Sequence, residues 1–217
     1  MLELRGAAPG LLDEPLLLEV GGAPPNAALT WRTRLRDDDG FVWRASGPSL
    51  DALTWAPAKP SASDVAALRS LRPVDLDVRV EEDASDAGAS RTLKRTLLAE
   101  GVRARRWKDG VAGTLYLPAE ATGGGAILDA RATDAASAVP VAAALLASRG
   151  ALVFALTRGT PEAARAALAA VPSAPSDVAI LDAVPLPPGV PARTPPDAAA
   201  WDALLADLGA RPRRVAR

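Results

Sequence analysis

The sequence predicts two parts: an immunoglobulin-like β-sandwich over residues 1–100 and, over residues 101–217, an α/β domain with a mostly parallel sheet of about five strands. Three observations lead to this fold class. Short strands with turn residues between them fill the first part, which is typical of a β-sandwich. Residues 111–157 show the order strand, loop, strand, helix, strand, which contains a βαβ unit. After Gly101 the alternating strands give way to longer apolar runs.

The β-sandwich prediction depends on strands that have one apolar and one polar face. Residues 28–35 alternate in this way, and Thr30, Arg32 and Arg34 form their polar face. Residues 74–81 alternate between valine or leucine and charged side chains. One buried face and one solvent-exposed face are typical of an antiparallel sheet.

Turn residues separate these strands. The run Asp37-Asp38-Asp39-Gly40 precedes the apolar residues 41–44, and an Asp-Gly pair between two such runs predicts a hairpin. Residues 16–20 predict a strand that ends at Gly21-Gly22. Residues 63–71 predict one short helix or turn.

A hairpin opens the second part, with strands over 102–107 and 111–117. Pro118 ends its second strand, because proline has no N–H to donate to a ladder. The residues Gly123-Gly124-Gly125 lack the Lys-Ser/Thr of a phosphate-binding loop and predict a flexible connector into the buried strand 126–128.

Helices alternate with strands over the rest of the chain. Ser137 is the expected N-cap of a first helix, which ends at Gly150. The strand 152–156 is apolar on both faces, as in a parallel strand with helices on each side. The remaining expected elements are a helix capped by Thr160 with Pro161 in its first turn, a strand at 177–181, a proline-rich stretch at 185–196 and an amphipathic helix at 197–208.

Composition excludes several classes of function. The chain has 25 Lys and Arg against 26 Asp and Glu, so no general attraction to nucleic acid or to an anionic membrane is expected. It has no cysteine and no histidine, which removes thiolate nucleophiles, zinc–thiolate sites and the usual general base. No run is long enough to span a membrane and no signal peptide is expected, so the predicted location is cytoplasmic. We predict no cofactor and no metal.

Several segments, in fixed order over about residues 6–182, match a known pattern. They are Leu11-Leu12-Asp13-Glu14-Pro15, Gly22-Ala23-Pro24-Pro25, Leu29-Thr30-Trp31-Arg32 through Arg36-Asp37 to Asp39-Gly40, Asp64 to Pro73, Gly101-Val102-Arg103, Gly113-Thr114-Leu115-Tyr116-Leu117-Pro118 and Ala144-Leu145-Leu146-Ala147-Ser148-Arg149-Gly150. This order resembles the acyl-CoA thioesterase and bile acid-CoA:amino acid N-acyltransferase family, in which a β-sandwich precedes an α/β-hydrolase domain.

The resemblance implies a nucleophile that this sequence does not contain. The strand at 178–181 should lead into a Gly-x-Ser-x-Gly elbow or its Cys variant, but Asp182-Ala183-Val184-Pro185-Leu186 follows, so the nucleophile position falls on Val184. Pro185 removes an N–H where an oxyanion donor is needed. No glycine stands in 129–134, where the resemblance implies an oxyanion loop, and the acid and histidine of the family would lie beyond residue 217. We therefore predict no catalytic residue.

The predicted function is that of a truncated, non-catalytic relative of acyl-CoA thioesterases with a binding, scaffolding or regulatory role. Two alternatives stay open. The chain is an acyl-CoA thioester hydrolase or acyltransferase that works through an unrecognised site or with a second polypeptide, or it is a decayed gene product with no selected role. An acyl-CoA or acyl compound is the ligand that the resemblance implies.

Three groups of side chains are candidate sites, and each also has a structural interpretation. The acidic run at 37–40 lacks the alternation and terminal Glu of a calcium loop, so a solvated hairpin turn is favoured. A basic group could bind CoA phosphates or nucleic acid, but solvated strand faces are favoured; it comprises Arg103, Arg105, Arg106 and Lys108, joined in sequence terms by Arg32, Arg34, Lys94 and Arg95. Asp129, Asp134 and Asp182 follow strands, where open α/β sheets bind ligands, yet surface caps are favoured.

The five tryptophans, at positions 31, 43, 55, 107 and 201, are a further candidate as an aromatic ligand site. Trp31 belongs to the apolar face of its strand and Trp201 to that of its helix, so both are predicted to pack in the core.

The strand Val178–Leu181 is the candidate partner surface. It is internal in a full hydrolase sheet, so a shorter sheet exposes its edge. Either the prolines of 185–191 return over this edge and blunt it, or the edge pairs with a second copy of the chain or with a protein partner.

Overall fold

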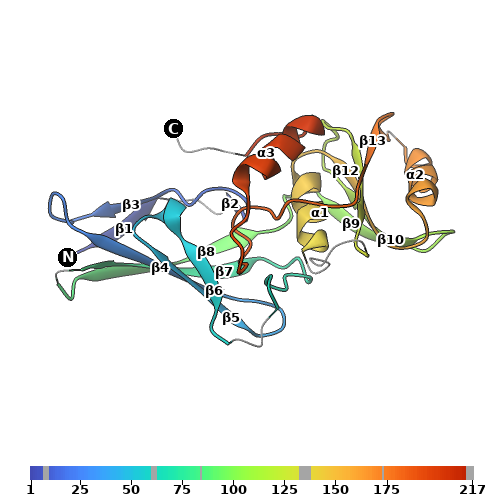
Figure 1. Ribbon diagram of the computed structural model, residues 1–217. Coiled ribbons are helices and arrows are strands. Elements are labelled where there is room, and N and C mark those ends of the chain that lie inside the picture. The colour runs from blue at the N-terminus through green and yellow to red at the C-terminus, as the bar shows by residue number, and fades with distance from the viewer. Residues whose placement is uncertain (7–9, 60–62, 84, 132–137, 173, 214–217) are drawn as a thin grey trace.

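Strands make up most of the regular structure, which a computed structural model describes for residues 1–6, 10–59, 63–83, 85–131, 138–172 and 174–213. They form sheets of six, five and two strands. Figure 1 shows the six-stranded and five-stranded sheets side by side, with helices α1 (Val139–Ser148) and α3 (Ala198–Asp207) close to the junction between them.

The six-stranded sheet comes from the first 96 residues, and its strand order is β2-β8-β7-β4-β5-β6. All of its pairings are antiparallel except that of β2 with β8. The strands are β2 (Gly10–Leu11), β4 (Leu29–Arg36), β5 (Val42–Gly47), β6 (Thr54–Pro57), β7 (Val74–Glu82) and β8 (Gly88–Thr96), with the short 3-10 helix η1 (Leu50–Ala52) before β6.

The alternation that predicted these strands is confirmed by burial. Trp31 and Leu35 of β4 are buried, whereas Arg32 and Arg34 are exposed. The two-stranded sheet of β1 (Glu3–Gly6) and β3 (Leu18–Gly21) packs its leucines and Val20 against the same core. The first part therefore has two β layers, which is compatible with a β-sandwich.

The five-stranded sheet is mixed, with two parallel and two antiparallel pairings, so the prediction of a mostly parallel sheet is only partly confirmed. Its order is β13-β11-β12-β10-β9, and β11 (Gly125–Asp129) is parallel to both β12 (Leu152–Arg158) and β13 (Val178–Leu181). The hairpin of β9 (Arg103–Trp107) and β10 (Ala112–Leu117) adds two antiparallel pairings. The two strands of a hairpin can only pair with each other in antiparallel fashion, and β10 then pairs antiparallel with β12.

Helices cover β12 on both faces, as its apolar sequence predicted. Val153 belongs to the same core cluster as α1, whereas Phe154 belongs to a second cluster with Ala164 and Leu168 of α2 (Pro161–Ala169). Thr160 caps α2, and its hydroxyl accepts from the N–H of Ala163 at 3.2 Å. Asp197 caps α3 in the same way.

Three local predictions concern the segments between these elements. Residues 63–71 were predicted as one short helix or turn; they form a loop with a turn at Arg69 and Ser70, where Asp38 accepts from the backbone and hydroxyl of Ser70. The triglycine is not a loose connector, because the N–H of Gly124 donates to Leu208 and that of Gly125 to Asp177. A Cβ on Gly123 would lie 2.9 Å from the carbonyl oxygen of Leu208, so glycine is needed for close approach. Ser137 lies outside the described residues.

The acidic turn forms the β4–β5 hairpin, but one of its carboxylates is buried. Asp37 is 6% exposed, and its Oδ1 accepts from the N–H groups of Asp39 and Phe41 at 3.1 and 2.8 Å. Its Oδ2 accepts from Trp43 Nε1 at 3.0 Å and from the N–H of Ala67 at 3.3 Å. Asp37 thus joins the hairpin to the loop 63–71, and it is not solvated as predicted.

Replacing Asp37 should cost far more stability than replacing its neighbour. We expect Asp37→Ala to lower the free energy of unfolding by about 3 kcal/mol, because it leaves a buried indole N–H and backbone N–H groups without acceptors. Asp39→Ala removes a carboxylate whose ion pair with Arg69 is exposed, and should change stability little. Urea unfolding followed by tryptophan fluorescence compares the two, and equal losses would show that Asp37 does not join these segments.

Candidate binding site at the junction of the sheets

The acidic residues predicted at the strand ends do not form an open site. The carboxylate of Asp129 accepts from Arg131 three times, from N at 2.9 Å, Nε at 2.8 Å and Nη2 at 2.6 Å. These hydrogen bonds lower the pKa of Asp129 from its usual value. Asp182 is exposed on the bend after β13, and Asp134 lies outside the described residues. Asp129 is therefore a cap, as predicted, although it is a buried one.

Val184 occupies no elbow. The chain leaves β13 through a bend at Asp182 and Ala183 and enters no helix until Ala198. A nucleophile elbow requires a sharp turn from strand to helix. Val184 instead packs half-buried against the main core, together with Leu186.

The basic residues do not gather in one patch. Arg103, Arg105, Arg106 and Lys108 are exposed on or beside the edge strand β9, whereas Arg32, Arg34 and Lys94 are exposed on the other large sheet. Arg95 is 3% exposed and belongs to the protein interior. Of the tryptophans, Trp31, Trp43 and Trp201 are buried in the core, which confirms the prediction for Trp31 and Trp201, and Trp55 and Trp107 are half-buried.

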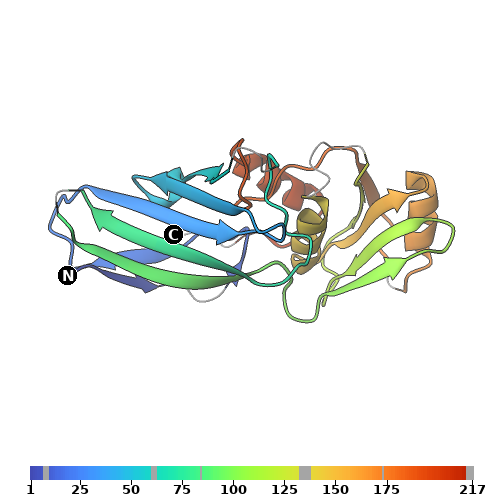
Figure 2. The same ribbon diagram turned by 90° about the horizontal axis from the view of Figure 1, so that it is seen from below.

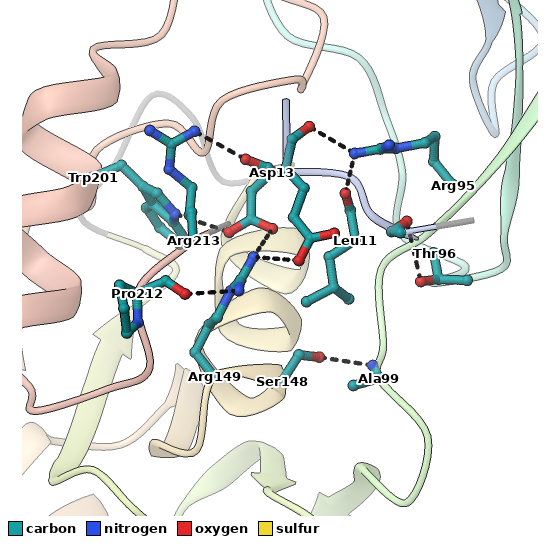
Figure 3. Close-up of polar contacts among 12 residues, drawn as sticks. Leu11, Asp13, Arg95, Thr96, Ala99, Ser148, Arg149, Trp201, Pro212 and Arg213 are labelled. Atoms are coloured by element: carbon teal, nitrogen blue, oxygen red, sulfur yellow. Dashed lines mark hydrogen bonds and ion pairs between the residues drawn. The ribbon is translucent and has the colours of Figure 1, made fainter. Parts of the chain in front are cut away.

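A buried ion pair joins the two parts of the chain at their junction (Figure 3). Arg149, which follows α1, donates from Nη2 to Asp13 Oδ1 at 2.9 Å and lies 3.4 Å from a carboxylate oxygen of Glu14. The side chain of Asp13 is fully buried and that of Arg149 is 6% exposed. Trp201 Nε1 of α3 donates to the other oxygen of Asp13 at 3.1 Å. Asp13 thus holds α1 and α3 against the N-terminal segment.

The C-terminal segment adds a second arginine to this network. Arg213 donates from Nη1 to the backbone carbonyl of Asp13 at 3.1 Å and from Nε and Nη2 to Asp202 of α3 at 2.6 and 2.7 Å. This bidentate pair lowers the pKa of Asp202 and raises that of Arg213. Arg149 also donates from Nη1 to the carbonyl oxygen of Pro212 at 3.0 Å.

Arg95 of β8 connects the network to the six-stranded sheet. Its Nη2 donates to the carbonyl oxygens of Leu11 and Glu14, the second at 2.6 Å. Burial lowers the pKa of Arg95, opposed by the carboxylates of Glu14 and Asp13. An arginine in a strand is thus used to hold the segment that carries Asp13.

A cavity of about 520 Å³ lies beside this network, between β6, the N-terminal segment and the proline-rich segment. Its apolar wall includes Leu12, Leu16, Leu53, Trp55, Leu76 and Pro188, and its charged wall includes Asp13, Glu14, Asp51, Arg95 and Arg213. Ligand pockets are commonly apolar cavities of this size with a few polar groups, and they occur preferentially between domains.

The polar side chains of this lining are carboxylates and guanidinium groups. The described residues around the cavity include no serine, threonine, tyrosine, lysine, cysteine or histidine, so none of them supplies a hydroxyl, thiol or amine nucleophile. The carboxylate of Asp13 accepts from both Arg149 and Trp201. Within the described residues, no group of three or more acidic side chains could hold a metal ion.

Sequence reasoning missed this site because its parts are far apart in the chain. Asp13 and Arg149 are separated by 136 residues, and Asp13 and Trp201 by 188. The segment 11–15 is notable in the sequence only for its place in the family pattern, and Arg149 only as the residue before a terminating glycine.

No helix in the described part of the chain is both long and apolar enough to cross a membrane.

No protein-family model matches this chain, and no curated protein matches it. The fold and the site by themselves define the class, which is a mostly β protein with a cavity between the six-stranded sheet, the N-terminal segment and segments near the end of the chain; we call it the junction cavity because it lies beside the Asp13–Arg149 network.

The Asp13–Arg149 pair should be strongly coupled in stability. We expect Arg149→Met and Asp13→Asn each to lower the free energy of unfolding by about 3 kcal/mol, because each leaves one buried partner uncompensated. The double variant should lose clearly less than the sum of the two, since neither charge remains.

Urea unfolding of the four proteins measures this coupling. Arg5→Met is the control, because the Arg5–Glu3 pair is exposed, and it should change stability little. Losses that simply add in the double variant would contradict a direct interaction between Asp13 and Arg149.

Proposed function

We propose that this protein is a non-catalytic relative of acyl-CoA thioesterases that binds an acyl compound in the junction cavity. The observation that carries the proposal is the cavity itself, which has an apolar wall, a charged wall and no hydroxyl, thiol or amine nucleophile among its described lining residues. An acyl chain would lie against Leu53, Trp55 and Leu76.

The architecture of the second part supports the family proposal. A hairpin opens the five-stranded sheet and a parallel βαβ unit follows, with α1 and α2 on opposite faces. This is the order expected for a reduced α/β-hydrolase domain. The absence of histidine from the sequence and the packing of Val184 against the core favour a binding role over hydrolysis.

Ligand binding is tested with variants of two half-buried tryptophans. Trp55 lines the cavity, whereas Trp107 lies on β9 of the five-stranded sheet. We expect palmitate and palmitoyl-CoA to raise the melting temperature of the wild-type protein and of Trp107→Ala, and to bind Trp55→Ala at least roughly tenfold more weakly in apparent Kd. Equal binding of the ligands by both variants would exclude the cavity as their binding site.

Catalysis is tested on the same samples. Release of CoA from acyl-CoA thioesters of several chain lengths should not exceed that of a control without protein. Turnover above the control would instead support the alternative, an enzyme that works through an unrecognised site.

A scaffolding role through β13 is the second candidate, and one observation favours it. The prolines do not return over the edge of β13: the N–H of Ala66 donates to the carbonyl of Pro191, and Val65 forms a bridge with Ala192. Figure 1 shows this segment running from β13 back towards the six-stranded sheet. β13 is the last strand of its sheet in the described part of the chain, and its outer edge pairs with no strand, although the carbonyl of Val178 accepts from Arg165 Nη2 at 3.1 Å.

Pairing through β13 predicts a self-associating protein. Size-exclusion chromatography with light scattering should give a dimer for the wild type and a monomer for Ala179→Lys, because a lysine on an edge strand opposes strand addition. Ala104→Lys, on the opposite edge strand β9, should stay dimeric. A monomeric wild type would exclude association between copies.

A further inference from the structure

One face of the six-stranded sheet is open and carries a group of arginines. Figure 2, seen from below, shows β4, β7 and β8 with no helix lying across them. The outward pleat of three neighbouring strands presents Arg32 and Arg34 of β4, Arg44 of β5 and Arg79 of β7. We call these four residues the arginine face.

The strand register brings these four side chains together. Arg32 lies opposite Arg79, and Arg34 lies opposite Arg44. Directly opposed residues have Cβ atoms about 5 Å apart, and like charges in such pairs destabilise a sheet. Two such pairs side by side lower the stability of the sheet, so the need to fold does not explain why these arginines are there.

Carboxylates compensate only part of this charge. Arg32 and Arg79 share one carboxylate, that of Glu81, at 3.1 and 2.8 Å. Asp77 lies opposite Arg34 but accepts from the hydroxyl of Thr92 at 2.7 Å. Among the described residues, neither Arg34 nor Arg44 forms an ion pair or a side-chain hydrogen bond. Both guanidinium groups are therefore available to a ligand.

The arginine face forms a broad hollow. Its volume is about 990 Å³, and hydroxyl side chains add hydrogen-bonding groups around the arginines: Thr30, Ser46, Thr54, Ser90 and Thr92. Its lining includes no aromatic side chain, although sites for single-stranded nucleic acid normally stack bases on aromatic rings. The chain as a whole has a net charge of -1, so this face is a local concentration of positive charge.

We propose that the arginine face binds an extended acidic segment of a partner protein. Arg32 and Arg34 are two residues apart on one strand, which separates them by about 7 Å. An extended peptide with acidic residues at alternate positions presents its carboxylates at the same spacing. Each guanidinium can bind one carboxylate through two parallel hydrogen bonds. This proposal does not depend on the junction cavity or on the family.

The test uses a fluorescein-labelled peptide of alternating glutamate and serine and compares two double variants. We expect Arg34→Gln/Arg44→Gln to weaken binding of this peptide by at least roughly tenfold in fluorescence anisotropy. Arg103→Gln/Arg105→Gln removes the same charge from exposed positions on β9 and should leave binding within about twofold. Equal weakening in both variants would show that binding of the peptide depends only on the net charge of the protein, and would overturn the proposal.

Three further measurements distinguish a peptide site from a structural role of these arginines and from binding of nucleic acid. Without peptide, Arg34→Gln/Arg44→Gln should raise the melting temperature, because it removes a like-charge pair; a lowered value would mean that these arginines stabilise the fold and would overturn the proposal. A serine peptide of the same length should not bind. Tighter binding of oligothymidylate than of the acidic peptide would assign the face to nucleic acid and also overturn it.

Discussion

The buried pair of Asp13 and Arg149 is the interaction on which the arrangement of this molecule depends. Both charges are removed from water, and neither can remain buried without the other except at a large cost in free energy. Asp13 lies near the N-terminus, Arg149 follows α1, and Trp201 and Pro212 come from the end of the chain. The fold therefore brings three distant regions of the chain together at this pair, and the junction cavity lies beside them.

Charged residues in the interior of this protein have a different role from those on its surface. Asp13, Asp37, Arg95 and Arg149 are buried and hold loops and segments in place. The arginine face keeps its charge at the surface of an uncovered sheet, where carboxylates satisfy only part of it. Buried charges with hydrogen-bond partners serve stability and positioning, whereas exposed, partly paired arginines can exchange water for a ligand.

Periodicity predicted the strands that alternate cleanly and missed those that do not. The strand β8 carries Arg91 and Arg95 on the same side as the buried Leu93, which hides its alternation. The strand β1 has only four residues and β2 only two, so they carry too little pattern. The cap at Thr160 was predicted because it acts within three residues.

The sequence by itself determined the amphipathic strands, the βαβ order and the helix cap at Thr160. These properties depend on residue types and on contacts between near neighbours. Only the tertiary structure decided that Asp13 meets Arg149, that the prolines pair with the loop at 64–66 and that four arginines share one face. Such contacts depend on which segments pack together. A local sequence pattern does not contain the strand register or the contact partner of a distant residue.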